Sequence, residues 1–111
     1  MKLFEFYISY ISWGSDGKYR PVLVFSLKDD VAFVYPVTSQ YENKSETIRA
    51  KYFKINDWPQ AGPDKQSYVD TGICFSVPIS ALRNKTPMVQ LSVEDTPRLI
   101  NFLSKRVVLL R

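Results

Sequence analysis

The sequence predicts a mainly β protein, a small curled antiparallel barrel that ends in an amphipathic helix. Short apolar or alternating blocks follow one another through most of the chain, polar or glycine-containing turns separate them, and only the C-terminal segment has a helical period. Aromatic side chains, which favour strands, make up 14% of the residues. A chain of 111 residues is expected to form one domain, 1–111.

The composition excludes several kinds of chemistry. The chain has no histidine, which removes histidine-based metal sites, Ser-His-Asp triads and histidine-based ribonuclease chemistry. The single cysteine, Cys74, cannot form an internal disulfide, and its apolar neighbours Ile73 and Phe75 predict a small buried thiol. We expect no metal and no cofactor. The net charge of +4 favours an anionic partner.

The N-terminal segment is apolar, but it carries Glu5 and lacks the small-residue cleavage site of a signal peptide. No apolar run approaches the roughly 20 residues that a membrane-spanning helix needs. We therefore expect a cytoplasmic protein that does not enter a membrane.

The first predicted strand covers residues 3–11, where apolar side chains occupy every second position. Its predicted buried face carries Phe4, Phe6, Ile8 and Tyr10. Two glycines in the polar stretch 12–17 predict a loop after this strand.

Two apolar runs, 22–27 and 31–37, follow the loop and are joined by the polar turn 28–30. This pattern predicts a hairpin whose strands are buried on both faces, as in the centre of a curled sheet. Pro36 cannot donate to a strand ladder, so we expect a bulge or bend just before Thr38.

The later segments are less regular. Residues 47–55 are a candidate strand with interspersed basic residues, and 57–66 predict an irregular loop. Residues 68–79 predict either two strands or one bent strand. Residues 81–83 form either a helical turn or the start of a last strand, and 86–87 form a turn.

The C-terminal segment predicts a helix that begins at Ser92 or Asp95, with Pro97 in its first turn. Residues 107–110 are either its last turn or a final strand. Its apolar stripe consists of Leu99, Ile100, Phe102 and Leu103. Several short strands closed by such a helix are typical of an SH3-like barrel.

A cation and a hydroxyl are expected at one edge of this sheet. Arg20 comes just before the first run of the hairpin, and Thr38 comes just after the second. Alone, Arg20 is readily explained as a surface cation, and Thr38 as a β-branched strand residue. Pro21, which fixes the entry to one strand, and Pro36, which bends the exit of the other, favour a functional pair.

These motifs, in this order, resemble the MazF/PemK family of toxins from bacterial toxin–antitoxin pairs. The resemblance rests on a first strand, a glycine-containing loop, Lys18-Tyr19-Arg20-Pro21, the strand end Pro36-Val37-Thr38-Ser39-Gln40 and the amphipathic helix. It implies an SH3-like curled sheet, a homodimer, and a metal-independent endoribonuclease that cleaves single-stranded RNA such as mRNA. It also implies that Arg20 and Thr38 are the catalytic pair. A cognate antitoxin with an acidic tail is the expected protein partner.

The two residues suit RNA cleavage by the strand's own 2′-hydroxyl. A guanidinium stabilises the charge that develops on the phosphate oxygens, but it is a poor base, and Thr38 would hold a phosphate oxygen or orient the 2′-hydroxyl. Glu5 is a candidate proton acceptor if its side chain faces the groove. Further candidate RNA-binding residues are Lys18, Tyr19, Ser39, Gln40, Arg49 and Lys51. The basic members of this set are equally explained as a solvated strand face.

An alternative function is non-enzymatic. CcdB-like toxins share this fold class and bind a topoisomerase, and a binding module that acts on another protein is also consistent with the sequence. If Arg20 and Thr38 point into one concave site, the ribonuclease is favoured. If they do not, the binding function is favoured.

Overall fold

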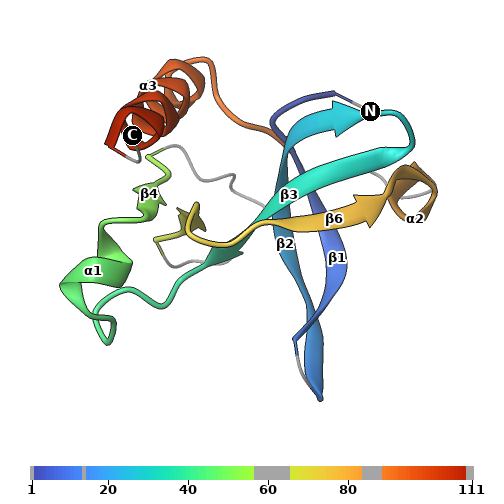
Figure 1. Ribbon diagram of the computed structural model, residues 1–111, viewed down its shortest axis with the longest axis horizontal. Helices are drawn as coiled ribbons and strands as arrows, with labels where there is room; N and C mark the ends of the chain where they lie inside the picture. The colour runs from blue at the N-terminus through green and yellow to red at the C-terminus, as the bar shows by residue number, and fades with distance from the viewer. Residues whose placement is uncertain (1, 14, 57–65, 84–88, 110–111) are drawn as a thin grey trace.

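The computed structural model describes residues 2–13, 15–56, 66–83 and 89–109 (Figure 1). Within these ranges the chain forms seven strands and three helices. They are β1 (Glu5–Trp13), β2 (Asp16–Lys28), β3 (Val31–Thr38), α1 (Glu46–Arg49), β4 (Tyr52–Lys54), β5 (Tyr68–Asp70), β6 (Phe75–Pro78), α2 (Ile79–Arg83), β7 (Val89–Gln90) and α3 (Asp95–Leu109).

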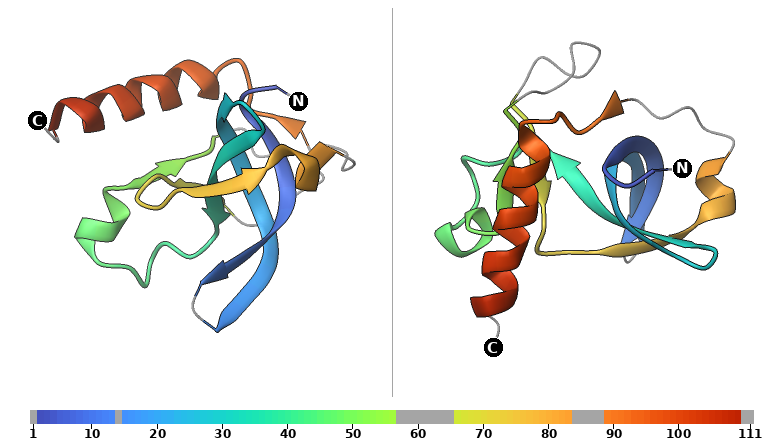
Figure 2. Two further views of the ribbon diagram at one scale, coloured as in Figure 1. Left: turned by 45° about the vertical axis from the view of Figure 1, so that its right-hand side comes forward. Right: turned by 90° about the horizontal axis from the view of Figure 1, so that it is seen from above.

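The strands form one antiparallel sheet in the order β4-β5-β3-β2-β1-β7, with β6 paired to β3. The predicted mainly β, curled antiparallel fold with a C-terminal helix is therefore confirmed. Strand β3 is central to the sheet, because it pairs with three other strands, β2, β5 and β6. Figure 2 shows the β1–β2 hairpin crossing the rest of the sheet at a steep angle and α3 lying on the side of β4.

The β1–β2 hairpin is longer than the sequence predicts, and its buried face differs. Pairing runs out to Trp13 and Asp16, so most of the predicted loop 12–17 is strand. Beyond Phe6 the buried side chains are Tyr7, Ser9 and Ile11, while Ile8 and Tyr10 are exposed. The hairpin projects away from α3 (Figure 1), and on its exposed face the Tyr10 ring makes an edge contact with Tyr19.

The predicted β2–β3 hairpin is present, but its irregularity lies elsewhere. Pro36 pairs in regular register with Val22, and the register shift falls between Val24 and Ser26. The expected bulge at Pro36 is therefore wrong. Pro36 instead marks the last pair with β2, after which β3 changes partner and pairs with β5 through Val37 and Thr38.

The central strands are buried on both faces, as the continuous apolar runs predict. Alternation along β2 places Leu23 in one hydrophobic cluster and Val22 and Val24 in another. The first cluster lies under α3 through Leu99, and the second is covered by Leu82 of α2. The hairpin is thus fixed between two packed layers, which holds the start of β2 and the end of β3 in place.

The candidate strand 47–55 is wrong for its first half. Residues Glu46–Arg49 form the one-turn helix α1, because Ser45 caps it: its Oγ accepts a hydrogen bond from the backbone N–H of Ile48 at 3.3 Å. Only Tyr52–Lys54 remains as strand β4. Most of the predicted loop 57–66 lies outside the described residues.

Residues 68–79 form two strands, β5 and β6, that pair with β3 rather than with each other. The predicted buried thiol at Cys74 is wrong, because this side chain is exposed between the two strands. The segment 81–83 is helical, as part of α2. The predicted turn 86–87 lies outside the described residues.

Helix α3 extends to Leu109. Most of the segment 107–110, for which the sequence allowed either helix or strand, is therefore helical. Ser92 closes the turn that enters the helix, since its Oγ accepts from the backbone N–H of Asp95 at 2.9 Å. Asp95 is buried and accepts from Arg98 Nη1 at 2.5 Å. Among the described residues, we find no helix with the length and apolarity to span a bilayer.

Candidate functional site

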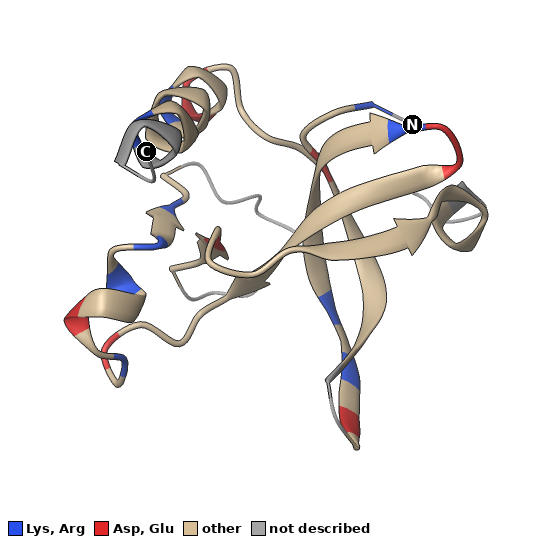
Figure 3. Ribbon diagram, in the orientation of Figure 1, with Lys and Arg blue, Asp and Glu red and all other residues tan. Residues whose placement is uncertain are grey.

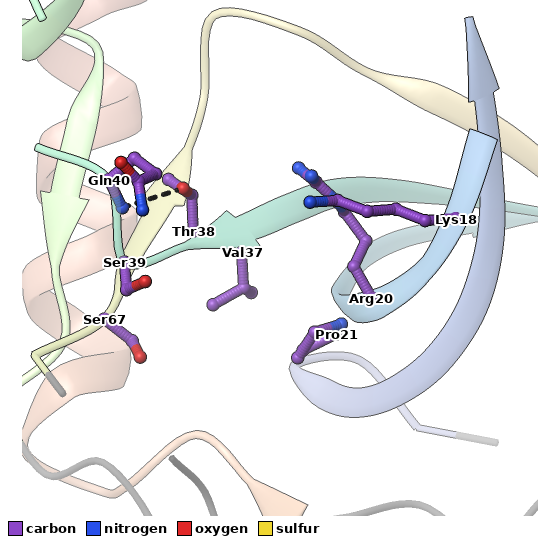
Figure 4. Close-up of a pocket in the computed structure, with 8 residues that line it drawn as sticks. All are labelled: Lys18, Arg20, Pro21, Val37, Thr38, Ser39, Gln40 and Ser67. Carbon is purple, nitrogen blue, oxygen red and sulfur yellow. Dashed lines mark hydrogen bonds between the residues drawn. The ribbon is translucent and has the colours of Figure 1, made fainter. Parts of the chain in front are cut away.

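A cavity of about 220 Å³ opens between the start of β2 and the end of β3 (Figure 4). It is lined by Lys18, Arg20, Pro21, Val37, Thr38, Ser39, Gln40 and Ser67. The two residues of the predicted catalytic pair therefore face one concave site. Three other candidates from the sequence, Lys18, Ser39 and Gln40, lie in the same cavity.

The cavity exists because two neighbouring strands diverge. Arg20 pairs with Ser9 of β1, whereas Thr38 pairs with Tyr68 of β5. Strands β2 and β3 are therefore paired only as far as Val22 and Pro36, and beyond that point each continues with a different partner. The cavity occupies the fork, with a cationic wall on β2 and a hydroxyl-bearing wall on β3.

Lys18 and Arg20 share a face of β2 because they are two residues apart. Figure 4 shows both side chains extending from β2 into the space that Thr38 faces. The Nε atom of Arg20 is shielded from solvent. Burial raises the pKa of the Tyr52 phenol on β4 above its ordinary value, and the positive charge of Arg20 opposes that rise without cancelling it.

Thr38 is oriented by its own turn. Its Oγ1 accepts a hydrogen bond from the backbone N–H of Gln40 at 3.0 Å (Figure 4). Because that bond uses the oxygen as acceptor, the hydroxyl proton can be donated to a ligand oxygen. Val37, on the opposite face of β3, is buried in the core and anchors this strand end. Ser39 and Gln40 are exposed at the opening.

The cavity offers donors suited to a phosphate. Arg20 presents a planar fork of N–H groups, Lys18 adds a second positive charge, and Thr38 and Ser39 add hydroxyls. None of the eight described residues that line it is acidic. A fixed guanidinium beside a hydroxyl matches the non-bridging oxygens of a phosphodiester, which carry negative charge in the ground state and more in the transition state.

Three sequence candidates do not line this cavity. Tyr19 lies between Lys18 and Arg20, so strand alternation points it to the other face, where it is 66% exposed and makes an edge contact with Tyr10 at 5.2 Å. Lys51 packs beside Gly72 in the turn after β5. The third, Arg49, has a different role.

Arg49 holds the segment that follows Thr38. Its Nε donates to the Tyr41 carbonyl at 3.1 Å, its Nη2 donates to the Glu42 carbonyl, and its guanidinium lies 5.0 Å from the centre of the Tyr41 ring. Tyr41 in turn stacks on Tyr68 with ring centres 4.4 Å apart. Arg49 therefore supports the loop after β3 rather than facing the cavity.

Glu5 is not positioned as a proton acceptor for the cavity. Its Oε1 accepts from the backbone N–H of Lys2 at 2.6 Å and from the Tyr7 hydroxyl at 3.1 Å, and it does not line the site. The condition for its candidacy, a side chain that faces the groove, is therefore not met.

Sequence reasoning missed Tyr52, a phenol on which the charges of both Arg20 and Asp70 act. Tyr52 pairs with Asp70 across β4 and β5. Burial raises the pKa of the Tyr52 phenol, the Asp70 carboxylate raises it further, and Arg20 opposes both. Nothing in the spacing of these residues signals this arrangement, because β4 ends at Lys54 and β5 begins only at Tyr68.

Comparison with protein-family models gives no match for this sequence, and comparison with curated proteins gives none either. Within the part of the chain that the structure describes, no group of three His, Cys, Asp or Glu side chains lies close enough to hold a metal ion.

Proposed function

We propose that the protein is an endoribonuclease that cleaves single-stranded RNA without a metal ion. The 2′-oxygen attacks the adjacent phosphorus and the bond from phosphorus to the 5′-oxygen breaks. The 2′-hydroxyl proton passes to solvent, and the leaving 5′-oxygen takes up a proton from solvent. The observation that carries this proposal is the convergence of Arg20 and Thr38 on one cavity from two diverging strands. The cavity is open to solvent, has two cations and lacks acidic side chains among its lining residues, which suits a phosphodiester.

Arg20 stabilises the negative charge that builds up on the non-bridging oxygens of the scissile phosphate. It does not act as the resting base, because a guanidinium with a pKa above about 12 stays protonated. Thr38 donates a hydrogen bond from its hydroxyl group to a phosphate oxygen, while its Oγ1 accepts a hydrogen bond from the backbone N–H of Gln40. Lys18 contributes a second, more flexible charge for the flanking backbone.

The biological role that fits this activity is a toxin of a toxin–antitoxin pair, as the family resemblance implies. An acidic antitoxin tail would neutralise Lys18 and Arg20 and compete with RNA for the cavity. We also propose a homodimer, on the basis of the same resemblance.

The alternative, a CcdB-like toxin or binding module, predicts no need for Arg20 and Thr38 to share a site. The two residues line one cavity, which favours the nuclease.

The test is incubation of the purified protein with single-stranded RNA in EDTA. We expect cleavage with 2′,3′-cyclic phosphate and 5′-hydroxyl ends. A matched strand with deoxyribose at every position should stay intact, and Arg20→Ala should cleave the RNA about 10²-fold more slowly or worse. Failure of the wild-type protein to cut any of a diverse RNA pool would contradict the proposal.

A further inference from the structure

The solvent face of β3, β5 and β4 carries a row of three paired residues. Thr38 pairs with Tyr68, and Tyr68 pairs with Lys54. Directly opposed residues in antiparallel strands point to the same face, so all three side chains share one surface. The alternate row, Val37, Val69 and Phe53, is buried, which fixes the first row as the outer one.

This row links the cavity to a second groove. Strands lie about 4.8 Å apart, so the row runs roughly 10 Å from the hydroxyl of the cavity to Lys54. Lys54 and Tyr52 line a groove of about 300 Å³ between β4 and α3. The groove also contains Lys105, exposed on α3, and Asn101.

Three aromatic side chains, Tyr52, Phe53 and Phe102, line the groove, and buried Phe53 makes an edge contact with Phe102 at 5.6 Å. Tyr41 and Tyr68 stack face to face, which closes the inner face of each ring. Tyr52 is tilted by 46° to the Tyr41 ring and by 36° to the Tyr68 ring, with both ring centres 6.2 Å away, so neither of these two rings stacks on it. The nearby carboxylate of Asp70 accepts from the backbone N–H of Gly72 at 2.9 Å.

Arg98 is not the ligand-binding cation of the groove. It pairs with buried Asp95, donates to the Lys54 carbonyl at 3.4 Å and lies 4.8 Å from the centre of the Phe53 ring. These contacts hold α3 against β4. The positive charge offered to a ligand therefore comes mainly from Lys54 and Lys105.

We propose that this groove is a second nucleotide subsite of a single-stranded nucleic acid that passes through the cavity. An unpaired base stacks on Tyr52, and the adjoining phosphate contacts Lys54 and Lys105. Alternating aromatic and cationic side chains along a groove are the pattern that binds single strands without sequence readout. The inference rests on the proposed function for the identity of the strand, and its test does not depend on cleavage.

The test measures binding of a fluorescent all-deoxy single strand, which has no 2′-hydroxyl and so stays intact. Lys54→Ala should flatten the slope of log affinity against log salt by about 0.7, the single-strand value for one phosphate contact. Lys28→Ala is the matched control, because Lys28 is exposed and is the last residue of β2, at the opposite end of that strand from Lys18, and it should leave the slope unchanged.

The aromatic contact is tested at one position. Tyr52→Leu should weaken binding roughly tenfold, the usual loss for one stacked base, whereas Tyr52→Phe should retain it. Thermal melting of each variant shows that it is folded.

An unchanged slope in Lys54→Ala, or equal affinities of Tyr52→Leu and Tyr52→Phe, would overturn the subsite. The subsite would also be overturned if Lys54→Ala weakened the binding of polyglutamate but left the affinity for the oligonucleotide unchanged. That result would assign the groove to an acidic protein. If the deoxy strand binds as expected but wild-type protein does not cut RNA, the subsite stands and the nuclease proposal fails.

Discussion

Two basic segments of this chain look alike in sequence but do different things in the structure. Lys18 and Arg20 lie on a strand beside a fork and face an open cavity. Arg49 lies in a one-turn helix and turns back onto the carbonyls of the loop that follows Thr38. Figure 3 shows basic residues both at the start of β2 and over α1, β4 and α3. A cation among hydrophobic residues thus indicates a site only when the backbone beside it leaves space for a ligand.

The largest expected effect comes from Arg20. Replacement by Ala removes the charge that faces the phosphate, and we expect the RNA cleavage rate to fall by about 10²-fold or more, the usual loss for one transition-state donor. Melting temperature should change little. Initial cleavage rates and thermal denaturation are the measurements. If Arg20→Ala kept more than a tenth of the wild-type rate, Arg20 would not be the cation that acts on the phosphate.

Thr38 should show the next largest effect. Thr38→Val keeps the shape but removes the hydroxyl, and a lost hydrogen bond to a charged phosphate is expected to slow cleavage roughly tenfold or more. Thr38→Ser is the matched control, since it retains the hydroxyl. If Val and Ser behave alike in single-turnover cleavage, the hydroxyl has no role.

Arg49 should affect stability rather than chemistry. Arg49→Ala removes two bonds to main-chain carbonyls and the contact with Tyr41, and we expect a loss of about 1–2 kcal/mol in the free energy of unfolding. The ion pair with Glu42, 3.8 Å long and with Glu42 91% exposed, should contribute little. Urea denaturation measures the loss. A stable variant with a severe cleavage defect would place Arg49 at the RNA instead.

The smallest effect concerns pH. Burial is the main cause that raises the pKa of Tyr7 above its ordinary value of 10.0, and the hydrogen bond to Glu5 raises it further. The folded state therefore keeps the phenol proton longer than the unfolded chain does. This contribution to stability is complete below pH 10 and is lost as the pH rises through the folded pKa. Between pH 9 and about 11, Tyr7→Phe should lose less stability than the wild-type protein. An equal fall of the urea midpoint in the two proteins over that pH range would contradict this.

The sequence predicted the part of the site that depends on local pattern. The hairpin of two apolar runs follows from their burial and the short turn between them, and it brings Arg20 and Thr38 to one edge. Strand alternation alone also separates Tyr19 from Lys18, an inference that periodicity allows without a structure.

The rest depended on contacts between distant segments. The fork exists because β3 exchanges β2 for β5, a strand of only three residues. The capping hydroxyl of Ser45 turned the apparent strand at Arg49 into a helix. Tyr41, Tyr52 and Tyr68 meet from three segments, and no local period connects them.

The central claim is that Arg20 and Thr38 act on one phosphate. A double-mutant cycle on the single-turnover cleavage rate tests it most directly, with Arg20→Lys, Thr38→Val and the double variant. If both side chains contact the same phosphate, the double variant should be slowed less than the product of the two single losses, by a coupling energy above about 0.5 kcal/mol. If the loss of rate in the double variant equals the product of the two single losses to within about 0.5 kcal/mol, the two residues act independently. That result would contradict the shared site.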